Sequence, residues 1–230
     1  DLVLTAATND CGAGATSGVT IDANDAVATY GGVAQVGASR TVTFANLTLT
    51  DGTATLGGIV YVGSGAHLGL DNTDLTYGSS PNLGGGLRIY SSTAEMINAS
   101  RIFECETTGG GSGGGAALDE GTLILRGDSR IGDYTLPNTS ADLGGGVYLY
   151  GGLLQMEDTS RVRSNTAATN GGGVYALNGG DIVMNDSADI GWSLSTAGNS
   201  AVDGGGGYLT GAGTSLTMND NSGVQFNSAS

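Results

Sequence analysis

The sequence predicts an all-β protein, a right-handed parallel β-helix of about eight coils with three short strands in each. Three observations predict this fold: a glycine cluster that recurs every 26 to 33 residues, an alternating apolar pair after each cluster, and a third apolar position farther on. No segment shows the 3.6-residue period of an amphipathic helix. A repeat this short cannot bury its apolar face alone, so neighbouring repeats must stack into a solenoid.

The first strand of each repeat follows the glycine cluster. Two residues after the last glycine come side chains that alternation places on the outer face, namely Val60, Arg88, Ala117, Tyr148, Tyr175 and Tyr208. Tyr90 and Tyr150 follow two residues later on the same face. A row of tyrosines on a flat sheet suits stacking on sugar rings or packing on a partner chain. Cross-strand aromatic pairs also stabilise a sheet that has no partner, so both interpretations stay open.

The second strand carries the alternating apolar pair, whose members share one face of a strand. The pairs are Val42/Phe44, Leu68/Leu70, Ala94/Met96, Leu123/Leu125, Leu154/Met156, Ile182/Met184 and Leu216/Met218. All four methionines, Met96, Met156, Met184 and Met218, occupy one position of the repeat. Since methionine fills apolar cores, this column predicts an internal stack rather than a sulfur metal site.

A polar turn follows the second strand. Its column reads Asn46, Asn72, Asn98, Gly127, Asp158, Asp186 and Asp220. Asn and Asp tolerate left-handed backbone and hydrogen-bond to neighbouring coils, so a structural ladder is expected here. Carboxylates on adjacent coils could also hold calcium, which makes Asp158, Asp186 and Asp220 weak candidates, and no other cofactor is expected.

The third strand is marked by one apolar residue per repeat, given by Leu49, Leu75, Ile102, Ile131, Val162, Ile190 and Val224. Arg101, Arg130 and Arg161 each precede this position by one residue, and so they are expected to stack on one outer face. Two interpretations stay open: an anion or glycan contact line, or a solvated face that pairs with carboxylates such as Glu104, Asp133 and Asp158.

Two regions are expected along the chain: residues 1–30 as an N-terminal cap or first coil, and residues 31–230 as one domain of β-helix repeats. The final repeat stops after Asn227-Ser228-Ala229, so the parent protein is expected to continue. Cys11 and Cys105 are either bridged or isolated thiols. The triplet Arg126-Gly127-Asp128 spells an integrin-type motif, but turn geometry explains its glycine equally well.

Composition limits the partners. Seven arginines, no lysine and 22 acidic residues give a net charge of −15, which disfavours nucleic acid and anionic membranes as partners. No apolar run reaches 18 residues, so direct membrane insertion of this segment is not expected.

Each repeat combines a glycine motif, followed by Ile, Leu, Val or Ala, with a short segment that ends in asparagine. This combination resembles the repeats of polymorphic outer membrane proteins. The resemblance covers about residues 31–230. The family's Phe-X-X-Asn motif is present here only as Val162–Asn165 and Val224–Asn227. The resemblance implies a right-handed β-helix passenger region, exported by an autotransporter-type barrel to the bacterial surface, with no catalytic residues to transfer.

The first functional hypothesis is therefore a non-enzymatic extracellular or cell-surface segment used in adhesion or display, with a glycan or a protein of a host or neighbouring cell as partner. An alternative is a polysaccharide lyase or hydrolase of the pectin-lyase-like kind, although repeats this short leave little room for a cleft. A third hypothesis is a filament or matrix protein that self-associates through its coil ends.

Overall fold

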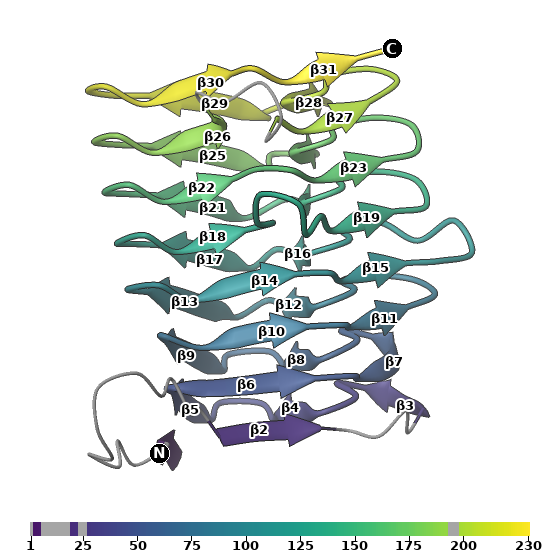
Figure 1. The fold of residues 1–230 in the computed structure, drawn as a ribbon, viewed down its shortest axis with the longest axis vertical. Helices are drawn as coiled ribbons and strands as arrows, with labels where there is room; N and C mark the ends of the chain where they lie inside the picture. Colours follow the sequence, from purple (N-terminus) through teal and green to yellow (C-terminus); the bar gives the residue numbers. More distant parts are fainter. Residues whose placement is uncertain (1, 6–18, 23–26, 193–197) are drawn as a thin grey trace.

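The computed structural model describes residues 2–5, 19–22, 27–192 and 198–230, and these form an all-β parallel solenoid of about seven turns (Figure 1). Each turn of the chain places its strands directly above those of the preceding turn. The described residues contain no helix, and so none that could cross a membrane.

Two of the four parallel sheets carry most of the apolar pattern. Sheet A consists of β1 (Leu2–Thr5), β5 (Thr41–Ala45), β9 (His67–Asp71), β13 (Thr93–Ile97), β17 (Thr122–Leu125), β21 (Leu153–Met156), β25 (Asp181–Met184) and β29 (Ser215–Met218). Sheet B consists of β2 (Val19–Asp22), β6 (Leu47–Thr50), β10 (Asp74–Thr76), β14 (Arg101–Phe103), β18 (Arg130–Ile131), β22 (Arg161–Val162), β26 (Asp189–Gly191) and β30 (Gly223–Gln225).

The other two sheets complete each turn. Sheet C consists of β3 (Val27–Tyr30), β7 (Thr53–Leu56), β11 (Ser79–Ser80), β15 (Glu106–Thr107), β19 (Thr139–Ser140), β23 (Thr166–Ala167), β27 (Ser200–Ala201) and β31 (Ser228–Ala229). Sheet D consists of β4 (Ala34–Val36), β8 (Val60–Val62), β12 (Leu87–Tyr90), β16 (Ala116–Asp119), β20 (Val147–Tyr150), β24 (Val174–Leu177) and β28 (Gly207–Thr210).

Each full turn therefore has four strands, and the prediction of three strands per coil was wrong. The missed strands are those of sheet C, most of which are only two residues long. Their inward positions are held by small residues such as Ser80, Ser140 and Ala167, which do not produce an apolar signal. Ser80 and Ser140 instead donate their hydroxyl protons to the backbone oxygens of Thr55 and Gly111 on the preceding coil.

The predicted apolar columns of sheets A and B are confirmed. The alternating pairs of sheet A are in register from Val42/Phe44 to Leu216/Met218, and the single apolar position of sheet B is in register from Leu49 to Val224. Met96, Met156 and Met184 lie fully buried in one column, while Met218 on the last coil is 44% exposed.

The glycine cluster forms the corner between sheets C and D. Gly144 has a φ of +63°, which costs an L-residue about 1–2 kcal/mol. A Cβ on the next residue, Gly145, would lie 2.5 Å from the carbonyl oxygen of Gly172 on the following coil. Only glycine therefore lets neighbouring coils approach closely enough to continue the hydrogen-bond ladder at this corner.

A buried asparagine ladder lies inside the corner between sheets B and C. Asn138, Asn165 and Asn199 are fully buried, and each donates its Nδ2 both to the Oδ1 of the next asparagine and to a backbone oxygen of the preceding coil. Asn227 ends the ladder at the last coil, and Cys105 takes the equivalent place before Asn138. This ladder supplies polar partners to a corner where the apolar core ends.

Candidate functional site

The outer side of sheet D carries the tyrosine face. Seven of the nine tyrosines belong to it, namely Tyr30, Tyr61, Tyr90, Tyr148, Tyr150, Tyr175 and Tyr208. Tyr30, at the end of β3, packs its ring 4.7 Å from that of Tyr61.

One member of the predicted outward column was wrong. Val60 is fully buried, and Tyr61 pairs in register with Arg88 instead. The shift by one residue arises because Ile59 occupies the place of the third glycine, as its backbone nitrogen donates to the oxygen of Gly86. A correct alignment of the Gly57-Gly58-Ile59 motif would have found Tyr61.

The remaining column is in the predicted register, and it divides into two parts. Tyr148, Tyr175 and Tyr208 stack with centroid separations of 5.9 and 5.5 Å and nearly parallel rings. The middle ring is only 9% exposed, and burial raises the pKa of Tyr175 above its ordinary value. Tyr175 therefore offers little surface to a ligand, whereas Tyr90 and Tyr150 are 43% and 41% exposed.

An ion pair lies between the two exposed tyrosines. Tyr90, Asp119 and Tyr150 occupy equivalent positions on three successive strands of sheet D. Arg88 extends over Ala117 and donates from Nη2 to Oδ2 of Asp119 at 2.9 Å. Arg88 is 4% exposed, and its Nε is buried without a hydrogen-bond partner among the described residues. The centre of the tyrosine face thus combines exposed aromatic rings with the partly exposed carboxylate of Asp119, whose charge is balanced by the buried guanidinium of Arg88.

The predicted arginine column is present on sheet B, where Arg101, Arg130 and Arg161 are in register and Asp189 continues the column. All three arginines already have carboxylate partners. Arg101 pairs with Asp74 and Asp133, and Arg130 and Arg161 share Asp128. Of the expected carboxylates, Asp133 takes part but Glu104 and Asp158 do not. This arrangement favours the pairing interpretation of the column over an anion contact line.

Asp133 is the centre of this charge network. It accepts hydrogen bonds from Arg101 and the buried Arg163 and lies 3.4 Å from Nε of Arg130. Burial acts to raise the pKa of Asp133, but the three guanidinium groups outweigh burial and the pKa lies below its ordinary value.

An aromatic clasp over Arg163 was not predicted. Arg163 is 1% exposed, and its guanidinium carbon lies 3.9 Å from the ring centre of Tyr134 and 4.6 Å from that of Trp192. Tyr134 and Trp192 follow Gly132 and Gly191, which leave sheet B with φ of +83° and +95° on the coils before and after Arg163. The sequence feature that could have indicated this contact is the length of the two longest repeats, which contain Tyr134 and Trp192.

The turn column between sheets A and B has the expected left-handed backbone, with φ between +47° and +67° from Asn46 to Asp220. Asn72 donates to Asn46, and Asn98 donates to Asp71. The carboxylates of Asp158, Asp186 and Asp220 each accept a backbone N–H from the preceding coil. The described residues contain no group of three or more potential ligands for a metal ion, so calcium binding by these aspartates stays a prediction.

The two remaining motifs lie in ordinary structural settings. Arg126 of the Arg126-Gly127-Asp128 triplet pairs with Glu95 and Glu157, and Gly127 adopts a φ of +67° in the turn column. Cys105 is a buried free thiol, whereas Cys11 lies outside the described residues, so a bridge between them stays untested.

Comparison of the chain with models of known protein families, with curated proteins and with solved structures finds no match.

Proposed function

We propose that this chain is a non-enzymatic β-solenoid that acts in adhesion, and that it binds glycan at the centre of its tyrosine face. The observation that carries the proposal is the arrangement of Tyr90, Asp119 and Tyr150 on three successive coils, with Arg88 paired to the aspartate. The exposed rings supply stacking surfaces for sugar C–H groups, and the carboxylate of Asp119, whose side chain is 31% exposed, supplies an acceptor for hydroxyl groups.

Repetition supports a polymer as the partner. Adjacent strands of a sheet lie about 4.8 Å apart, so the two exposed rings stand about 10 Å from each other along the solenoid axis. A chain of sugars that follows the axis would contact both rings and the ion pair between them. A rigid sheet holds these groups in place before binding, which lowers the entropic cost of association.

The carboxylates favour a binding role over catalysis. Asp158, Asp186 and Asp220 are engaged by backbone amides, and Asp128 and Asp133 are engaged by arginines. A general acid or base needs a carboxyl free to exchange a proton with substrate. The alternative of a polysaccharide lyase or hydrolase therefore receives less support.

The resemblance to polymorphic outer membrane protein repeats extends this proposal to location and form. We infer a right-handed winding with about eight coils, in a segment displayed on the surface of a bacterial cell or secreted from it. The stiffness of stacked coils suits such a role, since a rod holds its binding face away from the surface that anchors it.

The test is a glycan array followed by titration of any hit with purified variants. The double substitution Tyr90→Ala/Tyr150→Ala should abolish binding with the melting temperature nearly unchanged, and Asp119→Asn should weaken it. Phe226→Ala serves as the control, because this exposed aromatic residue lies outside the tyrosine face. Binding that survives the double substitution would refute the proposal.

A further inference from the structure

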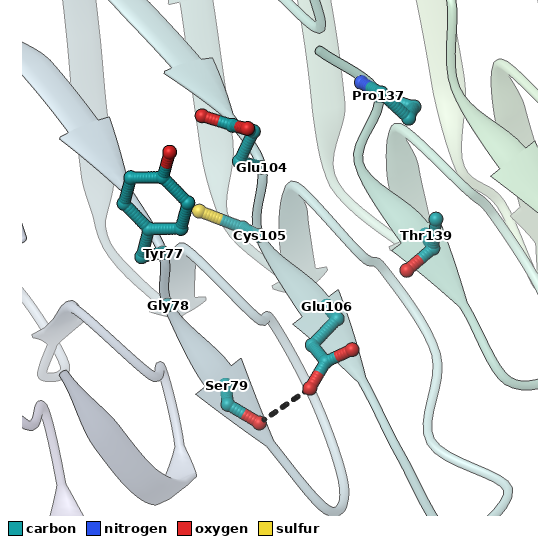
Figure 2. A pocket seen from close by; sticks show the side chains of 8 residues that line it. All are labelled: Tyr77, Gly78, Ser79, Glu104, Cys105, Glu106, Pro137 and Thr139. Carbon is teal, nitrogen blue, oxygen red and sulfur yellow. Dashed lines mark hydrogen bonds between the residues drawn. The ribbon is translucent and has the colours of Figure 1, made fainter. Parts of the chain in front are cut away.

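A pocket opens at the corner between sheets B and C, well separated in the repeat from the tyrosine face of sheet D. It has a volume of about 260 Å³ and is lined by Tyr77, Gly78, Ser79, Glu104, Cys105, Glu106, Pro137 and Thr139. Figure 2 shows the ring of Tyr77 on one side, Pro137 and Thr139 on the other, and Cys105 with the two glutamates between them.

The backbone of the repeat creates this pocket. Tyr77 and Glu104 occupy the same bend on adjacent coils, and both have a left-handed φ, +55° and +54°. On the next coil the chain does not make this bend but leaves sheet B at Gly132 and returns at Pro137, before β19. Pro137 therefore forms a wall beside the glutamates, which a regular coil would not provide.

The pocket is negatively charged and has no basic group in its lining. Six of the seven arginines pair with carboxylates elsewhere in the described part of the chain, and neither Glu104 nor Glu106 is among their partners. Glu106 accepts a hydrogen bond from the hydroxyl of Ser79. A hydrogen bond to Glu104 raises the pKa of Tyr77, so the phenol stays neutral at neutral pH.

The shape and chemistry favour an ammonium group over a metal ion. Calcium takes six to eight oxygen ligands, whereas this pocket offers two carboxylates and a few hydroxyls between an aromatic ring and a proline ring. A primary ammonium has three N–H donors, which two carboxylates and one hydroxyl satisfy, and it is attracted to the face of a tyrosine ring. Cys105 adds no nucleophile, because burial raises the pKa of its thiol to about 12.

We propose that this pocket binds a small molecule or side chain through a primary ammonium group, held between Glu104 and Glu106 against the ring of Tyr77. The volume lies just below the 300–1,000 Å³ of drug-sized sites, which suits a ligand of monosaccharide or amino-acid size. This site is independent of the glycan-binding function proposed for sheet D.

The test uses two ammonium probes and their neutral partners on the full chain, monitored by amide chemical shifts in NMR titrations. Glucosamine is compared with N-acetylglucosamine, and Nα-acetyl-lysine amide with its Nε-acetylated form. We expect at least one ammonium probe to bind and to shift the amides of residues 77–79 and 104–106, while its neutral partner does not bind. The probe that binds distinguishes an amino sugar from an amine on an aliphatic chain.

Substitutions complete the test. Glu104→Gln and Glu106→Gln should each weaken binding about 10- to 100-fold, the usual effect of losing a hydrogen bond to a charged group. Glu120→Gln is the matched control, because Glu120 is an exposed glutamate with a φ of +53° at another turn, and it should leave the affinity unchanged. Absence of binding by both ammonium probes, equal binding of the neutral partners, or calcium binding at these amides would each overturn the proposal.

Discussion

The buried asparagine ladder gives the sharpest prediction about stability, through the substitution Asn165→Ala. Asn165 Oδ1 accepts hydrogen bonds from the Nδ2 and the backbone nitrogen of Asn138, at 2.9 and 3.4 Å. Removal of this oxygen leaves two buried N–H groups of Asn138 without an acceptor. The carbonyl of Ile131 and the Oδ1 of Asn199 keep other donors, so they are not orphaned.

The magnitude follows from these two groups. A buried donor that loses its partner costs about 1–3 kcal/mol, so Asn165→Ala should lower the free energy of unfolding by roughly 2–6 kcal/mol. Asn72→Ala is the control, since this exposed asparagine makes one side-chain hydrogen bond to Asn46. Its left-handed φ of +47° would strain alanine, so a loss of about 1 kcal/mol is expected.

Urea unfolding monitored by circular dichroism compares the two variants. Asn165→Ala should lower the unfolding midpoint by clearly more than Asn72→Ala does, with the slope of the transition unchanged. Equal shifts of the two midpoints would show that the inner ladder contributes no more than an exposed turn, and would refute the reasoning.

Three further predictions concern other buried groups. Arg163→Gln should lower the free energy of unfolding by about 3 kcal/mol, because it breaks a buried pair and empties the aromatic clasp; a loss below about 1 kcal/mol in urea unfolding would contradict the clasp. Between pH 9.0, the ordinary pKa of the thiol, and about pH 12, the pKa of Cys105 in the folded chain, only the unfolded chain loses the thiol proton. The free energy of unfolding should therefore fall by about 1.4 kcal/mol per pH unit in this range. Alkaline unfolding of Cys105→Ala should lack this contribution. Gly145→Ala should cost about 3 kcal/mol or more, whereas Gly37→Ala, where an added Cβ meets no atom within 4 Å, should be neutral or slightly stabilising; equal melting temperatures would argue against close contact of coils at the glycine corner.

The strands that bury apolar side chains could be predicted from the sequence, whereas the strands of sheet C could not. Leu123 and Leu125 alternate because both point into the core, and that pattern recurs on every coil. Sheet C was not predicted because its buried positions are occupied by residues such as Ser80 and Ser140. Their side chains form hydrogen bonds to the neighbouring coil instead of apolar contacts. A composition pattern does not distinguish such serines from solvated ones.

The candidate site was predictable in its residues but not in its contacts. Tyr90 and Tyr150 were placed on the outer face by alternation alone, yet the ion pair between them depends on how far Arg88 reaches across Ala117. The clasp over Arg163 joins Tyr134 to Trp192, which are 58 positions apart on insertions of two different coils. Such contacts arise from the stacking of coils, and no local periodicity reports them.

The most direct test of the glycan-binding proposal is a titration of the folded chain with a glycan identified on an array, followed through the tyrosine ring signals in NMR. The ring signals of Tyr90 and Tyr150 should shift first and together, those of Tyr175 should change little, and those of Tyr134 should stay unchanged. Saturable binding without any shift of Tyr90 and Tyr150, or a folded chain that binds no glycan on the array, would contradict the account.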